Sequence, residues 1–336
     1  MSLRGRVLVM AGVLVLVCGA SAAYLVHDAE RYRQRHDAAP AVAVAARAGL
    51  PDGPRIVFRH TGTDRSFGLV AGVPLADPGG ERSISDVACD RVDAVGEVVS
   101  CLHTVRGVVT RHELRELDAA LRERHTVSLP GIPSRTRLSP DGGLVATTTF
   151  VSGHSYLQTG FSTATEIRDV GGEGHGNLER FALVLDGEEV RPADRNLWGV
   201  TFLDDRTFYA TAATGGRTHL VRGDLEARTL TGLRENAECP ALSPDGTRLV
   251  YKVDGPEPGT QWSFAVLDLA SGEETVLGGQ PPGVDDQAAW LDDDTILYGL
   301  PREDEPGVTD VWALDTTAEA TPRLLIEQAW SPAVVR

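Results

Sequence analysis

The chain has 336 residues, 42% of them hydrophobic, so it can bury a large core as one all-β domain or as two smaller domains. Its formal net charge of −16 argues against a nucleic-acid partner, which would require a basic face. The 36 glycines and 19 prolines suit a fold with many tight turns.

The N-terminus carries the clearest localisation signal. Arg4 and Arg6 precede an uncharged stretch over residues 7–26, which has the length of about 20 residues that crosses a bilayer. We therefore expect an uncleaved signal anchor in the cell membrane, with the rest of the chain extracytoplasmic. The alternative is a signal peptide cleaved near Ala20-Ser21-Ala22, which would give a secreted protein.

Export would place the cysteines in an oxidising compartment, where disulfides form. Cys89 and Cys101 lie in a segment typical of two strands around Ala94-Val95-Gly96. In an oxidising compartment we expect a disulfide across this hairpin, and two buried free thiols are the alternative. Cys239 has no evident partner, and no Cys/His spacing indicates zinc.

A Pro-Asp-Gly turn followed by a short apolar strand recurs along the chain. Pro restricts φ at the second position of the turn, and Gly supplies the positive φ at its exit. We therefore expect a structural role for the Asp and Gly of each clear copy, which are Asp52, Gly53, Asp141, Gly142, Asp245 and Gly246.

Degenerate copies extend the repeat to six. When the copies are aligned on the residue before each turn, the steps are 42, 46, 64, 40 and 48 residues. Four of the five steps fall near the roughly 40–50 residues of a four-stranded propeller blade. The aligned residues are Leu50, Val92, Leu138, Phe202, Leu242 and Trp290.

The two ends of the chain indicate how the array closes. Trp330-Ser331-Pro332 resembles the start of a seventh copy, whereas the first copy lacks a convincing strand before Pro51. We expect the C-terminal strand to fill that place, because ring closure removes exposed sheet edges. The sequence thus predicts an N-terminal apolar helix over residues 1–26, a linker over 27–49 and a closed six-bladed β-propeller of four-stranded blades over 50–336.

The Ser-Pro-Asp-Gly turn with an apolar strand after it resembles the PD40 repeat of the TolB-like six-bladed propellers. The similarity is strongest at residues 138–146 and 242–251. It implies a propeller of the cell envelope that is used mainly for protein–protein contact, as in a TolB-like translocation protein.

Two segments stand out from the repeat. Leu114, Leu117 and Leu121 follow a helical spacing, so we expect a short helix over residues 112–124, with an irregular strand pair as the alternative. The long third step leaves room for an insertion around the glycine-rich residues 171–177. Both segments, together with the mouth of the central channel, are candidate contact surfaces.

The sequence offers little support for a catalytic motif or a catalytic metal site. The strings at residues 153–157 and 160–164 lack the final glycine of the Gly-x-Ser-x-Gly elbow of hydrolases. A metal site in the central channel would need converging carboxylates, and most candidates stand in the repeat turns, where Asp serves the backbone. These candidates are Asp204, Asp205, Asp285, Asp286, Asp292, Asp293 and Asp294.

We therefore expect a non-catalytic, monomeric propeller that binds a protein partner of the cell envelope, with no catalytic residue, cofactor or metal. The alternative is a lactonase-like hydrolase that holds a divalent cation in the central channel.

Overall fold

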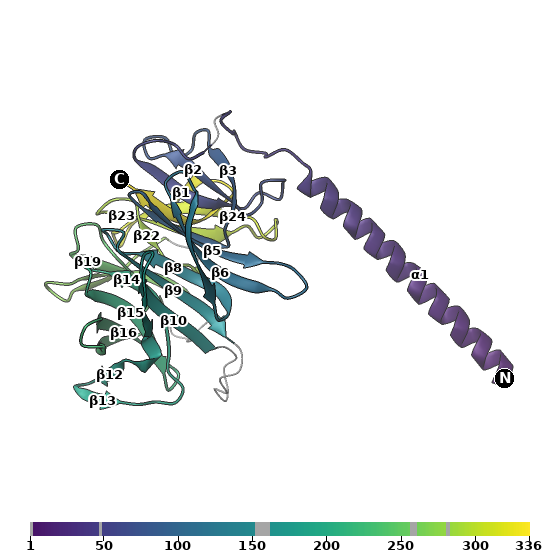
Figure 1. Ribbon diagram of the computed structural model, residues 1–336. Helices are drawn as coiled ribbons and strands as arrows, with labels where there is room; N and C mark the ends of the chain where they lie inside the picture. The colour runs from purple at the N-terminus through teal and green to yellow at the C-terminus, as the bar shows by residue number, and fades with distance from the viewer. Residues whose placement is uncertain (1–2, 47–48, 152–161, 256–260, 280–282) are drawn as a thin grey trace.

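The computed structural model describes residues 3–46, 49–151, 162–255, 261–279 and 283–336. It consists of a long helix, α1 (Leu3–His36), followed by strands that form six sheets (Figure 1). In each sheet one strand lies nearest the central axis, and these innermost strands contact one another from sheet to sheet all around the ring. The predicted six-bladed β-propeller is thereby confirmed.

Each blade has four strands that run from the central channel to the outside. In that order, blade 1 comprises β26 (Ala329–Val335), β1 (Arg55–His60), β2 (Leu69–Pro74) and β3 (Ser83–Ala88); blade 2 comprises β4 (Arg91–Val95), β5 (Val98–Val105), β6 (Arg111–Asp118) and β7 (Glu123–Leu129); blade 3 comprises β8 (Ile132–Leu138), β9 (Leu144–Val151), β10 (Ser162–Asp169) and β11 (Gly174–Asn177); blade 4 comprises β14 (Asn196–Phe202), β15 (Thr207–Thr214), β16 (Arg217–Asp224) and β17 (Thr229–Glu235); blade 5 comprises β18 (Glu238–Leu242), β19 (Arg248–Asp254), β20 (Trp262–Asp268) and β21 (Glu274–Val276); blade 6 comprises β22 (Ala289–Trp290), β23 (Thr295–Pro301), β24 (Thr309–Asp315) and β25 (Arg323–Ile326).

The ring closes through blade 1, whose inner strand comes from the C-terminus. β26 pairs antiparallel with β1, and the register runs from Arg55 opposite Val335 to His60 opposite Ala329. In Figure 1 the C-terminus accordingly lies beside β1. This confirms the predicted closure by the C-terminal strand, but Trp330-Ser331-Pro332 is not a truncated turn. These residues lie at the start of β26, opposite the end of β1, so the match to the turn sequence was coincidental.

The hydrophobic core is divided among the six junctions between blades. Successive side chains of a strand point to opposite faces, and in a propeller each face meets a neighbouring blade. In β1, Ile56 and Phe58 pack in the cluster shared with blade 6, whereas Val57 packs in the cluster shared with blade 2. Runs of consecutive apolar residues follow from this two-sided burial.

Two-sided burial also explains why the expected helix over residues 112–124 is wrong. The segment forms β6, a turn and the start of β7, which was the alternative. Leu114 packs toward blade 3, and Leu117 packs in the cluster shared with blade 1. A spacing of three places two residues on opposite faces of a strand, and because both faces are buried here it imitates the apolar stripe of a helix.

The insertion lies later than expected. Part of the segment 171–177 is β11, the outer strand of blade 3, so this segment is a blade element. The extra residues form a 3-10 turn, η1 (Leu178–Arg180), and a hairpin of β12 (Ala182–Leu185) and β13 (Glu188–Val190). β12 pairs parallel with β17, so this hairpin adds two strands to the outer edge of blade 4, as Figure 1 shows.

The chain contains the predicted disulfide. Cys89 lies between blades 1 and 2, and its sulfur is bonded to that of Cys101 on β5, with the Cα atoms 5.4 Å apart. The bond fastens the connection between the two blades to the second strand of blade 2.

α1 projects away from the propeller in Figure 1. Its segment Gly12–Arg31, with a mean hydropathy of 1.6, is long and apolar enough to cross a membrane. The helix continues to His36, through the first ten residues after position 26.

Candidate binding site in the central channel

One mouth of the central channel opens into a funnel of about 850 Å³. Its wall is built by the ends of the six inner strands and by the turns that follow them, so every blade contributes to it. The Pro-Asp-Gly turns of blades 3 and 5 stand at this mouth because each joins an inner strand to the second strand of its blade. The copy at Asp52 and Gly53 precedes β1 and does not line the funnel, because the inner strand of blade 1 comes from the C-terminus.

The turn in blade 3 shows how its charged residue is used. The Asp141 carboxylate accepts hydrogen bonds from Ser139 Oγ at 2.5 Å and from the Gly143 N–H at 3.0 Å. Ser139 Oγ in turn accepts from the Leu144 N–H, and Gly142 has a φ of +73°. The hydrogen bond from Ser139 lowers the pKa of Asp141.

The turn in blade 5 repeats this network. Asp245 accepts from Ser243 Oγ at 2.5 Å and from the Thr247 N–H at 3.0 Å, and Gly246 has a φ of +73°. These carboxylates, together with that of Glu97 in the corresponding turn of blade 2, stand exposed on the wall of the funnel. We call Glu97, Asp141 and Asp245 the rim carboxylates.

Blade 2 shortens the turn. Val95 and Val98 pair across a two-residue loop that begins at Gly96, three residues later than the alignment on Val92 implied. Asp93 is consequently a residue of strand β4, where it is buried and accepts a hydrogen bond from the Leu138 N–H at 2.7 Å. Burial raises the pKa of Asp93.

Trp290 forms part of the funnel wall between blades 5 and 6. It is buried, and its indole Nε1–H donates to the Ala241 carbonyl at 2.9 Å. The tryptophan before the turn of blade 6 therefore packs between blades. The C-terminal residue lies beside it, where the Arg336 guanidinium donates to the carbonyls of Trp290 and Leu291.

Below the funnel the channel narrows to a cavity of about 20 Å³. Three arginines line it: Arg91 on β4, and Arg135 and Arg137 on β8. Arg135 and Arg137 are two positions apart on a strand, so both side chains point to the same side, toward the channel. We call these three residues the channel arginines.

The channel arginines have distant acidic partners. The shortest nitrogen–oxygen distances are 3.5 Å for Arg91 to Asp286, 3.8 Å for Arg135 to Asp285 and 3.9 Å for Arg137 to Asp93. Burial, with the nearby charge of Arg135, lowers the pKa of Arg91 to about 9 although Asp286 opposes the shift. The Arg91 guanidinium also stacks on the Trp330 ring at 3.8 Å.

The aspartates considered for a metal site are dispersed. Asp285 forms an ion pair of 2.8 Å with Lys252 and Asp286 faces Arg91, whereas Asp204 and Asp292 accept backbone N–H groups within their turns. Among the residues that the structure describes, no group of three or more His, Cys, Asp or Glu side chains is arranged to hold a metal ion.

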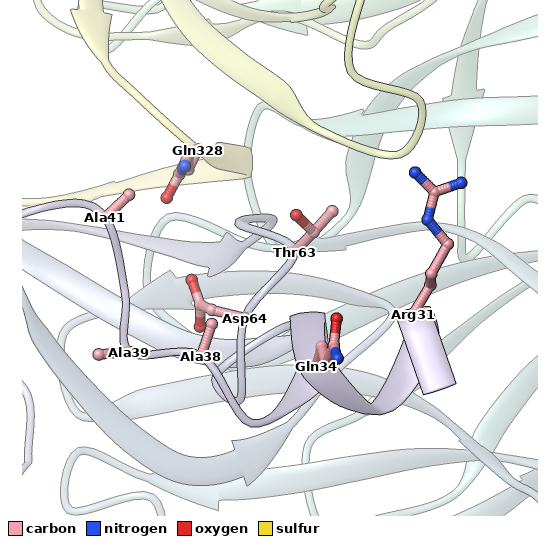
Figure 2. Close-up of a pocket in the computed structure, with 8 residues that line it drawn as sticks. All are labelled: Arg31, Gln34, Ala38, Ala39, Ala41, Thr63, Asp64 and Gln328. Atoms are coloured by element: carbon pink, nitrogen blue, oxygen red, sulfur yellow. The ribbon is translucent and has the colours of Figure 1, made fainter. Parts of the chain in front are cut away.

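A second pocket, of about 380 Å³, lies between the end of α1 and blade 1. Figure 2 shows Arg31 and Gln34 from the helix, with Thr63 and Asp64 from the loop after β1. Beneath it His60 is buried, with Nε2 2.9 Å from Asp64 Oδ2 and Nδ1 3.2 Å from an Arg82 nitrogen. Burial lowers the pKa of His60, although its hydrogen bond to the Asp64 carboxylate opposes the shift.

Sequence reasoning missed the channel arginines. The available signal was a charged residue at alternate positions of two inner strands, Arg91-x-Asp93 and Arg135-x-Arg137. Of the two near matches to the hydrolase elbow, the string at residues 153–157 lies outside the described residues, and the string at 160–164 lies only partly within them.

Comparisons with known proteins agree with the fold. The chain is similar to TolB from Acinetobacter baumannii, with a TM-score of 0.59 and 14% identity over 85% of this chain and 68% of TolB. It is similar to a chain of a nidogen–laminin complex, with a TM-score of 0.51 and 12% identity over 84% of this chain and 98% of that one.

A puromycin-hydrolyzing peptidase from Mycobacterium tuberculosis has a TM-score of 0.51 and 14% identity over 83% of this chain, which spans only 44% of the peptidase. No family model matches the chain, and no curated protein matches it in sequence. The chain has the six-bladed propeller fold of TolB, as the repeats predicted.

Proposed function

We propose that the protein is a membrane-anchored, extracytoplasmic β-propeller that binds a protein partner of the cell envelope at the funnel and performs no catalysis. The observation that carries the proposal is the funnel itself. It holds about 850 Å³, opens at one face and is walled by all six blades, so a segment of another polypeptide can enter it.

Two features of the chain support the proposed location. α1 contains a segment long enough to span a membrane, and the propeller follows it in sequence. The Cys89–Cys101 disulfide is typical of proteins in oxidising compartments, as opposed to the cytosol.

The state of the carboxylates supports a binding role. Asp141 and Asp245 are engaged by the hydroxyl and N–H groups of their own turns, and Asp285 is paired with Lys252. A divalent cation requires several oxygen ligands at one point, and these carboxylates face different partners.

The test is quantitative crosslinking from intact cells with the full-length tagged chain, analysed by mass spectrometry. Glu97→Arg reverses a rim charge, and Glu188→Arg makes the same change on the exposed hairpin of blade 4. We expect one envelope protein to be recovered by the wild type and by Glu188→Arg, and recovered about tenfold less by Glu97→Arg, the effect of about 1.4 kcal/mol at 25 °C.

Equal recovery by both variants would contradict the assignment of the funnel. Recovery of no envelope protein by the wild type would contradict the proposed function as a whole.

A further inference from the structure

The channel arginines hold donors that the described part of the chain does not use. A guanidinium offers five N–H donors in a planar fork. Among the described residues, the Nε atoms of Arg135 and Arg137 are buried and find no hydrogen-bond partner. Arg137 donates through Nη2 to the Ala288 carbonyl, and Arg91 donates to Asp286 at the long distance of 3.5 Å.

The nearby acids do not replace those missing acceptors. Three guanidinium groups line the narrow cavity with two carboxylates, Asp93 and Asp286. The Asp93 carboxylate already accepts the Leu138 N–H at 2.7 Å and lies 3.9 Å from Arg137. Asp285, farther along, lies 2.8 Å from Lys252 and 3.8 Å from Arg135, so two cations share this carboxylate. The cavity therefore carries excess positive charge that a further anion would balance.

The shape of the channel restricts how an anion can arrive. Arg137 and Asp93 line both the funnel and the narrow cavity, so Arg137 is the first channel arginine that a ligand meets. The cavity beyond it, about 20 Å³, admits a single small group. A chain end can point a carboxylate there while the chain runs lengthwise through the funnel, whereas an internal acidic side chain would require the backbone to double back.

The funnel has opposite charge at its two levels. The exposed rim carboxylates, Glu97, Asp141 and Asp245, are negative, and the arginines at its base are positive. Arg336 also lines the mouth, and its guanidinium already donates to two backbone carbonyl groups. A ligand that complements this arrangement has a negative tip and positive groups several residues behind it.

We propose that the funnel captures the C-terminal carboxylate of a partner polypeptide, with Arg137 as its first ligand and with lysine or arginine residues of the partner facing the rim carboxylates. The proposal rests on the proposed binding function and names the chemistry of its partner. Arginine and carboxylate form charge-assisted, often bidentate hydrogen bonds, which suits a terminal carboxylate with two equivalent oxygens.

The test uses the full-length protein in detergent and a displayed library of random peptides with free C-termini. We expect enrichment of sequences with lysine or arginine a few residues before the end. The most enriched peptide is then synthesised with a free carboxylate and with a C-terminal amide, and we expect the amide to bind at least about tenfold more weakly, as loss of a charged hydrogen bond implies.

Variants place the effect at the channel. Arg137→Met should weaken binding of the free-acid peptide to the level of the amide, and Arg137→Lys should give an intermediate affinity because it keeps the charge without the fork. Arg191→Met, on an exposed arginine beside the hairpin of blade 4, is the matched control and should bind as the wild type does. Thermal unfolding shows whether each variant folds.

No enrichment, equal binding of acid and amide, or unchanged binding by a folded Arg137→Met overturns this proposal. Crosslinking to an envelope partner that depends on Glu97 would still stand after such a result, so failure of the carboxylate site is distinguishable from failure of the binding function.

Discussion

The aspartates of the repeat turns and the arginines of the channel differ in where their partners lie. Asp141 is bonded to Ser139, two residues away, whereas Arg91 faces Asp286, 195 residues away, and Arg137 donates to Ala288, 151 residues away. The turn carboxylate finds its partners within one hairpin, whereas the channel arginines meet theirs only once the ring has assembled. Charged side chains are thus held by a single blade in one region and by the assembled ring in the other.

Removal of the closing strand should have the largest effect, because it disrupts the channel and leaves the turns intact. Deletion of residues 329–336 removes β26, which is the inner strand of blade 1 and contacts β4 of blade 2. Every turn keeps its local partners, but blade 1 exposes an unpaired edge and the channel loses a side. We expect loss of the cooperative unfolding transition by circular dichroism. Arg336→Gln, which keeps β26, should unfold cooperatively, and a cooperative transition in the deletion would contradict this account.

The disulfide tests a contact of intermediate range. Cys89 and Cys101 are 12 residues apart, so opening this loop should cost about 3 kcal/mol of unfolding free energy in the chain-entropy model. The double variant Cys89→Ala/Cys101→Ala is compared with the wild type by denaturant unfolding, and reductant should destabilise the wild type alone. An equal response of both proteins to reductant would mean that the bond contributes nothing.

Replacement of a turn glycine tests how much the repeat turn itself contributes to stability. Gly142 has a φ of +73°, so Gly142→Ala should lower the free energy of unfolding by roughly 1–2 kcal/mol, the cost of the left-handed region for a residue with a Cβ. Gly107→Ala is the matched control, because Gly107 lacks a positive φ and an added Cβ meets nothing closer than 3.8 Å. The same loss in both variants would attribute the effect to something other than the turn conformation.

His60 offers the smallest effect, at the junction of blades 1 and 6. Because burial lowers its pKa in the folded state, the unfolded chain binds a proton more readily, and stability should fall as the pH drops below the ordinary histidine value of about 6.5. His60→Gln should unfold with a shallower pH dependence between pH 7 and 5. A variant with the same slope as the wild type would exclude His60 as the group responsible.

The sequence predicted the parts of the fold that depend on local partners. The turn around Asp141 and Gly142 carries its hydrogen-bond partners within a few residues, so its spacing revealed the blades and their number. The helix expected at 112–124 was wrong because Leu114 and Leu117 face two different blades, and no local pattern records that both faces of a strand are covered.

The candidate site could be predicted much less well. Arg91 and Arg137 are unremarkable strand residues until the ring brings β4 and β8 together around one axis. Asp93 was assigned to a turn because the sequence alignment places the hairpin of blade 2 three residues too early. The register of a strand and its place beside distant strands are set by the assembled fold, so one sequence does not reveal them.

The central claim is that the channel arginines serve binding, whereas a turn carboxylate that lies outside the funnel serves the fold. It is tested most directly by the amount of envelope partner crosslinked per folded molecule of Arg137→Met and of Asp204→Ala, a turn residue that does not line the funnel. The account predicts that Arg137→Met loses the partner and that Asp204→Ala, though less stable, retains it. Retention by Arg137→Met, or loss by folded Asp204→Ala, would contradict it.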